Sequence, residues 1–221
     1  MSNLKRIVLF ILSIPKIIYF NFKYLRFRDA IKFPILISKR VWIKNARGKV
    51  QIQSPISFGM IKIGFGDVAI FDSVKSRSIW DVTGTVIFRG RANIGHGVKI
   101  SVSGTLILGD SFSISAESSI ICKEKVSFGA HCLISWENLI MDTDFHDILD
   151  SEGNVINPSK EIVIGDNVWI GCRCTILKGT QIGNNTVIAA NSCLHSIIDG
   201  SNKIIGGNLA RILKEEITWR A

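Results

Sequence analysis

The chain has 221 residues, 47% of them hydrophobic, with 19 Gly and 4 Pro, which is typical of one large globular domain and excludes a disordered protein. Its net charge of +9 comes from the N-terminus, because residues 1–40 hold nine Lys or Arg and one acid, whereas residues 41–221 carry only +1. A basic stripe along the whole domain is therefore missing, and nucleic acid is not expected as a partner.

Residues 1–48 form a basic, amphipathic segment. The apolar run at residues 7–15 resumes after Lys16, but Lys16 and Pro15 interrupt it, so it falls short of the ~20 residues that span a bilayer. No small-residue cleavage site follows, so a signal peptide is not expected. Aromatic and basic residues alternate in residues 19–33, which suits a membrane surface. Two alternatives stay open: peripheral membrane contact through residues 1–40, or packing on the rest of the protein.

A strand system is predicted to begin at residue 49, after which aliphatic and aromatic residues recur at intervals of six. The register slips twice by two residues, which indicates one longer face rather than loss of the repeat. Residues 72–85 fit poorly and are predicted to form a loop or an irregular face. The register consists of Phe88, Ile94, Ile100, Leu106, then Leu108, Ile114, Ile120, Val126, then Phe128, Ile134 and Ile140.

Residues 141–160 interrupt the repeat with a polar, acidic, turn-rich stretch that contains His146. A loop that leaves a rigid repeat structure is where function usually lies. Imidazole can deprotonate a hydroxyl near neutral pH because its pKa is about 6.5, and a nearby carboxylate can orient it. Asp142 and Asp144 both qualify as that carboxylate, and the sequence does not choose between them. A surface histidine without a role is the alternative.

From residue 164 to 194 the repeat is regular, with a period that fits neither a helix nor a strand. Such short units can bury their apolar residues only by stacking on their neighbours. Three units close one triangular coil, with the aliphatic side chains inside and Gly or Asn at the corners. We therefore predict an all-β prism of about 18 residues per coil. The inward residues are Ile164, Ile170, Ile176, Ile182, Ile188 and Leu194.

Residues 162–192 and 206–214, together with residues 141–148, resemble the hexapeptide-repeat acyltransferases, and among them the enzymes that O-acetylate sugars and surface polysaccharides. The resemblance covers most of residues 50–214. It implies a left-handed parallel β-helix, a homotrimer and acetyl-CoA as donor. No metal is expected, because the histidines lack the spacing of the family's zinc-binding members. The expected layout is an N-terminal helical segment (1–48), the β-helix (49–205) with a protruding loop at 141–160, and a C-terminal tail (206–221) for which a helix is one option.

The same resemblance assigns roles to individual residues. His146 matches the family's catalytic histidine, whereas His96, His131 and His195 are weaker candidates and lack the spacing of the zinc-binding members. The donor would contact an exposed ring, two small residues and a basic pair that meets the CoA phosphates. These residues are Trp169, Cys172, Ala190, Arg211 and Lys214. The alternatives are a surface ring and a solvated charge pair.

Three departures from the family pattern affect these assignments. The usual Asn-Pro turn is Asn208-Leu209, the usual Thr-Lys pair is His195-Ser196, and residues 115–117 lack the asparagine of the galactoside enzymes. Acceptor binding must therefore differ from that of the galactoside enzymes. Just upstream of the loop, Trp136, Glu137 and Asn138 are the candidates for the acceptor side.

The sequence predicts a cytoplasmic, trimeric, acetyl-CoA-dependent O-acetyltransferase, in which His146 deprotonates a hydroxyl of a surface polysaccharide or its lipid-linked precursor. Membrane contact would place the protein at the inner face of the cell membrane. Three alternatives remain: an N-acetyltransferase of an amino sugar, a serine O-acetyltransferase, and a non-catalytic scaffold. The serine enzyme is disfavoured because residues 1–48 show no dedicated helical domain.

Overall fold

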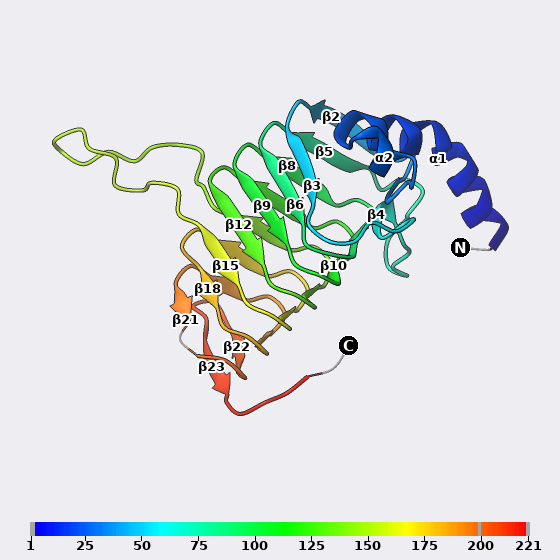
Figure 1. The fold of residues 1–221 in the computed structure, drawn as a ribbon. Coiled ribbons are helices and arrows are strands. Elements are labelled where there is room, and N and C mark those ends of the chain that lie inside the picture. Colours follow the sequence, from blue (N-terminus) through cyan, green and yellow to red (C-terminus); the bar gives the residue numbers. More distant parts are fainter. Residues whose placement is uncertain (1–2, 199, 220–221) are drawn as a thin grey trace.

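A computed structural model describes residues 3–198 and 200–219, which wind into a triangular prism with a helix across one end (Figure 1). The three faces of the prism are parallel sheets, here named A, B and C, and the chain visits them in that order on each coil. Sheet A contains β1 (Ile35–Ile37), β4 (Ile61–Phe65), β7 (Ala92–Gly95), β10 (Phe112–Ile114), β13 (Leu133–Ile134), β16 (Trp169–Ile170), β19 (Val187–Ile188), β22 (Ile204–Gly206) and β23 (Arg211–Lys214).

The other two faces follow the same order along the prism. Sheet B contains β2 (Val41–Ala46), β5 (Ser78–Val82), β8 (Lys99–Val102), β11 (Ser119–Cys122), β14 (Leu139–Met141), β17 (Thr175–Leu177) and β20 (Cys193–Leu194). Sheet C contains β3 (Lys49–Ile52), β6 (Thr85–Phe88), β9 (Thr105–Leu108), β12 (Lys125–Phe128), β15 (Ile162–Ile164), β18 (Gln181–Ile182) and β21 (Ile197–Ile198).

The predicted hexad register is the core of the prism. Every residue of the register, from Phe88 to Leu194, is at most 3% exposed. The two slips fall on β9 and β12, where alternate residues of one strand both point inward, for example Leu106 and Leu108. These strands pair in register, Leu106 with Val126 and Leu108 with Phe128, so identical inward positions stack from coil to coil.

The structure corrects one predicted boundary and decides the form of two segments that the sequence left open. The prism begins at β1 rather than at residue 49, because β1 and β2 already pair in parallel with β4 and β5. Within residues 72–85, predicted to form a loop or an irregular face, residues 78–82 form β5, and Trp80 on that strand is fully buried. The C-terminal tail forms β23, antiparallel to β22, and not a helix. The strands β1, β2 and β5 were not predicted because their apolar residues are irregularly spaced. They are strands because they pair with strands of the neighbouring coils.

The N-terminal helix α1 (Asn3–Tyr24) packs with one face on the first coil, and a short α2 (Phe27–Ala30) follows it. Buried Asn21 holds this contact, since its amide donates to the Ile35 carbonyl at 2.7 Å and accepts from the Ile35 amide at 3.2 Å. Phe20 adds an edge-to-face contact with Trp80, with 5.2 Å between ring centres. Of the two alternatives for the N-terminal segment, membrane contact or packing on the rest of the protein, this face of α1 shows the packing.

The opposite face of α1 is apolar and exposed. Contrary to the expectation from the interrupted run, Leu4–Tyr24 is long and apolar enough to cross a membrane by length and composition, and 28% of this stretch is buried against the prism. An exposed apolar helix face of this size marks a surface that contacts a protein or a membrane. The exposed residues include Leu4, Ile7, Val8, Ile11, Leu12, Ile18, Tyr19 and Phe22.

Candidate active site

The loop at residues 142–161 leaves the prism at the edge between sheets B and C, after β14 and before β15. Figure 1 shows it as a long yellow-green arm that points away from the prism. An antiparallel bridge between Leu149 and Val155 closes its outer end into a turn around Asp150. His146 is exposed on this arm.

Asp142 fixes the root of the loop. Its side chain is 0% exposed, and its two oxygens accept hydrogen bonds from the backbone amides of Lys123, Glu124 and Lys125 at 2.7, 2.8 and 2.8 Å. A carboxylate with three backbone donors has little acceptor capacity left. Asp142 therefore has a structural role. This differs from the predicted role, which was to orient the His146 ring.

Asp144 belongs to a polar clamp that ties the start of the loop to its end and to the prism. Lys178 donates to Asp144 at 2.5 Å and to the Asn157 carbonyl at 2.7 Å. The Asn157 amide donates to Asp144 at 2.8 Å and to the His146 carbonyl at 2.9 Å. The ammonium of Lys178, and after it the Asn157 amide, lower the pKa of Asp144, so this carboxylate is ionised at neutral pH. Lys178 and Asn157 escaped the sequence reasoning because neither has a motif.

The clamp fixes the backbone of His146 and leaves its ring free. Among the residues that the structure describes, the imidazole has no hydrogen-bond partner, and neither Asp142 nor Asp144 bonds to it. A general base that must reach a substrate needs this kind of access.

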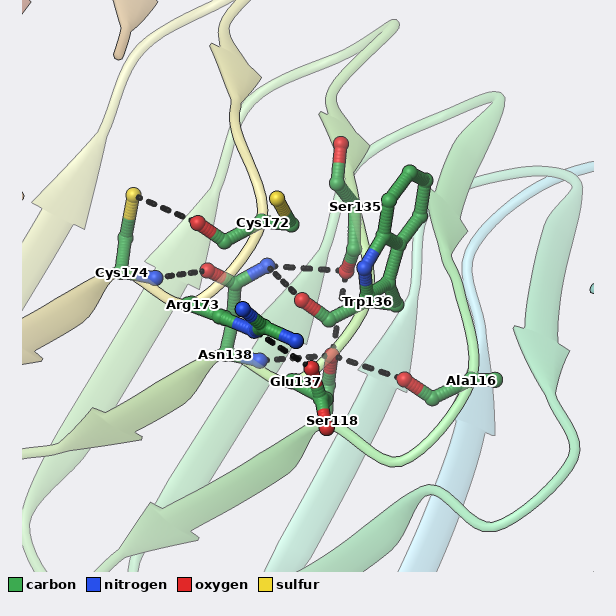
Figure 2. Close-up of polar contacts among 9 residues, drawn as sticks. All are labelled: Ala116, Ser118, Ser135, Trp136, Glu137, Asn138, Cys172, Arg173 and Cys174. Atoms are coloured by element: carbon green, nitrogen blue, oxygen red, sulfur yellow. Dashed lines mark hydrogen bonds and ion pairs between the residues drawn. The ribbon is translucent and has the colours of Figure 1, made fainter. Parts of the chain in front are cut away.

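A row of buried polar side chains lines the inside of the edge between sheets A and B, as Figure 2 shows. Ser118 donates to the Ser135 carbonyl at 3.1 Å and accepts from the Asn138 amide. The Asn138 side chain donates to the Ser135 carbonyl at 2.8 Å and accepts from the Cys174 amide at 2.8 Å. Asn138 is 2% exposed and links successive coils. Contrary to the prediction, its polar atoms are therefore not available to bind an acceptor.

The residues between these buried positions face outward along the same edge. Trp136 is half-buried, and Glu137 forms an ion pair with Arg173 at 2.8 Å (Figure 2). Both Glu137 and Arg173 have positive φ, 57° and 60°, as the sharp corner requires. Trp136 and Glu137 thus remain on the surface, next to a cation that the sequence analysis did not single out.

The donor candidates gather on sheet A and its edge with sheet B. Trp169 lies on β16 and is 39% exposed, while Cys172 and Ala190 occupy equivalent corner positions of neighbouring coils, because Trp169 pairs with Val187. Arg211 and Lys214 lie exposed on β23, three strands from β16 in the sheet. At about 4.8 Å per strand, this surface is roughly 14 Å long.

The C-terminal tail adds a residue that the sequence analysis missed. Trp219 packs on Trp169, with 5.9 Å between ring centres, and its indole donates to the Asn167 carbonyl at 2.7 Å. The Ile217 amide donates to the Asn202 carbonyl at 3.0 Å, so the tail runs back along the edge between sheets C and A. Residues 215–219 have no repeat that would predict this path.

The described part of the chain has no group of three His, Cys, Asp or Glu residues placed to hold a metal ion. All five cysteines are free thiols. Burial raises the pKa of Cys122 to about 12 and that of Cys132 to about 11, so both are unreactive core residues. Cys174 is buried, as its place in the repeat predicts, whereas Cys172 is partly exposed.

Comparison with known proteins shows which family has this architecture. Residues 161–196 match the family described as bacterial transferase hexapeptide (six repeats). The chain is 30% identical over 202 residues to a 24.8 kDa protein in the cps region of Klebsiella pneumoniae, covering 90% of this chain and 87% of that protein. It is 39% identical over 104 residues to the polysialic acid O-acetyltransferase of Neisseria meningitidis, covering 47% of this chain and 48%, about half, of that enzyme.

Among solved structures, a hexapeptide-repeat acetyltransferase from Vibrio cholerae in complex with acetyl-CoA has a TM-score of 0.51 and 26% identity, over 59% of this chain and 70% of that one. Stacked six-residue units around an aliphatic core are the repeat architecture of the transferase family whose model matches residues 161–196. This chain belongs to the hexapeptide-repeat acetyltransferase family. The predicted parallel β-helix and acyltransferase class are confirmed.

Proposed function

We propose that the protein transfers an acetyl group from acetyl-CoA to a sugar hydroxyl of a surface polysaccharide or of its lipid-linked precursor. The observation that carries the proposal is an exposed, unpaired imidazole on a clamped loop, His146, in a member of an acetyltransferase family. A relative that O-acetylates polysialic acid and another in a cps region both favour a glycan acceptor.

In the proposed mechanism, His146 accepts the proton of the acceptor hydroxyl as its oxygen attacks the thioester carbonyl. The carbon–sulfur bond then breaks, and the proton passes to the departing CoA thiolate. The ionised Asp144, two residues away, favours the imidazolium that forms between these steps. Trp169, Cys172 and Ala190 would hold the pantetheine arm, and Arg211 and Lys214 the phosphates.

The placement of these groups favours a homotrimer. The loop leaves from the edge between sheets B and C, whereas the donor candidates lie on sheet A and its edge with sheet B. One prism therefore holds its imidazole and its donor surface at different edges. Packing of prisms side by side would bring the loop of one copy to the donor surface of the next, and would complete a site at each interface.

The exposed face of α1 favours a peripheral position at the cytoplasmic side of the membrane. Its apolar side chains are accompanied by the basic residues that give the N-terminus its charge, a combination that binds anionic bilayers. An enzyme in this position would meet a lipid-linked glycan where it is assembled.

The test is an assay with acetyl-CoA labelled in the acetyl group and fragments of bacterial surface glycans. We expect a labelled glycan whose acetyl group is released by mild alkali, since esters hydrolyse and amides resist. An alkali-stable product would support the N-acetyltransferase alternative. If acetyl-CoA neither acetylates any glycan nor raises the melting temperature, the protein is a scaffold and the proposal is wrong.

Trp219→Ala is expected to raise the KM for acetyl-CoA roughly 3- to 10-fold, the value of one aromatic contact, with kcat nearly unchanged. The reason is that Trp219 and Trp169 form one apolar shelf at the donor surface. Steady-state kinetics measure the split, and Trp219→Phe should restore most of the loss. A lower KM in Trp219→Ala would mean instead that the tail competes with the donor.

A further inference from the structure

A strongly basic hollow lies at the N-terminal end of the prism, on the edge between sheets A and B. It has a volume of about 500 Å³ and forms where residues 39–43 meet residues 74–77 beside α1. Five of its lining residues are cations and none is acidic. The cations are Lys16, Lys39, Arg40, Lys75 and Arg77.

Three of these cations are held in place by the fold. The Lys16 ammonium donates to the Lys39 and Val41 carbonyls at 2.8 and 2.6 Å. Arg40 donates to the Ser73 carbonyl, and the Arg77 guanidinium lies 5.0 Å from the centre of the Trp42 ring. Burial, and then Arg77, lower the pKa of Lys16.

In the described chain, no carboxylate forms an ion pair with any of the five cations. Carbonyls and a ring position three of them without an ion pair, so an anion that enters the hollow meets a net positive charge.

A second, apolar groove of about 320 Å³ adjoins the basic hollow and shares Lys39, Arg40 and Val74 with it. The α1 side of the groove is formed largely by exposed aliphatic side chains, which include Leu4, Val8 and Leu12. Figure 1 shows α1 lying across this end of the prism near β2. The two hollows are thus neighbours: the first is lined by cations and the second largely by aliphatic side chains.

We propose that the two hollows together bind one phosphate-bearing lipid of a membrane, with its phosphate or diphosphate in the basic hollow and the start of its chain in the groove. Ammonium and guanidinium groups are the preferred partners of phosphate oxygens. The exposed face of α1 would lie in the same bilayer, so the lipid need not leave it.

The position of the site also gives it a place in the proposed reaction, and this step alone rests on the proposed function. The hollow and the candidate acceptor residues Trp136 and Glu137 lie on the same edge of the prism, three coils apart. At about 4.8 Å per coil, the separation is roughly 14 Å. A glycan attached to the bound phosphate would run along this edge towards them.

The test is flotation of the full-length protein with phosphatidylcholine vesicles that contain or lack phosphatidic acid. We expect binding to the vesicles with phosphatidic acid, and a loss of roughly fivefold per neutralised cation, hence about 25-fold in Lys75→Gln/Arg77→Gln. The matched control is Arg89→Gln/Arg91→Gln, which removes the same charge from exposed positions outside both hollows and outside the basic N-terminal segment and should retain most binding.

Equal losses in both double variants would show diffuse attraction and overturn the site. If pyrophosphate stabilises the protein but the protein does not bind vesicles, the proposed lipid is wrong. The ligand of the basic hollow is then a soluble phosphate compound. Val8→Ser/Leu12→Ser should weaken binding without changing charge, and full binding by this variant would also contradict the proposal. Because binding is measured without acetyl-CoA, failure here is distinct from failure of the acetyltransferase assignment, and melting temperatures show whether each variant folds.

Discussion

His146→Ala is expected to lower kcat for acetyl transfer roughly 10²- to 10⁴-fold, the usual value of a general base, while the KM for acetyl-CoA stays near that of the wild type. Its ring is exposed and makes no hydrogen bond within the described residues, so its removal costs the fold little. Initial rates over a range of acetyl-CoA concentrations separate the two constants.

The matched control is His195→Ala. His195 is also exposed and follows β20 at the same edge between sheets B and C, but it lies outside the loop. It should retain full activity. If His146→Ala transfers acetyl groups at nearly the wild-type rate, His146 is not the base and the proposed mechanism is wrong.

The sequence predicts those structural elements whose stabilising contacts repeat at a fixed spacing along the chain. The hexad register was readable because each inward aliphatic residue repeats the same burial, and all of them, from Phe88 to Leu194, are core residues. Trp80 is also core, yet residues 72–85 lack the spacing, since β5 is defined by pairing with β2 and β8. Periodicity reports local repetition and not long-range pairing.

The polar residues show the same limit more sharply. Asp142, Asp144 and His146 look alike in sequence as parts of one acidic loop, but three backbone amides bind the first carboxylate and Lys178 binds the second. Asn138 looks like an acceptor ligand because it precedes the loop, and it is a buried link between coils. Chemical type marks a side chain as able to serve a site, whereas its burial and partners decide whether it is free to do so.

Asp142→Ala is therefore expected to be the most destabilising change in the loop, with a loss of about 3–5 kcal/mol in the free energy of unfolding. The substitution removes the acceptor of three backbone amides, at a side chain that is 0% exposed, and leaves those amides without their partner. For a chain of this size, the melting temperature should fall by roughly 10 °C, measured at fixed protein concentration.

Asp142→Asn keeps one side-chain oxygen as an acceptor and should lie between the wild type and Asp142→Ala. Asp144→Ala is the matched control, because it removes an exposed carboxylate of the same loop and should leave the melting temperature almost unchanged. The two variants also separate structure from catalysis. If Asp142→Ala melts like the wild type but loses acetyl transfer, Asp142 acts through His146 after all. If it melts early and keeps its activity at low temperature, its carboxylate serves only to fix the root of the loop, and Asp144 is the one of the two predicted carboxylates that remains a candidate for assisting the imidazole.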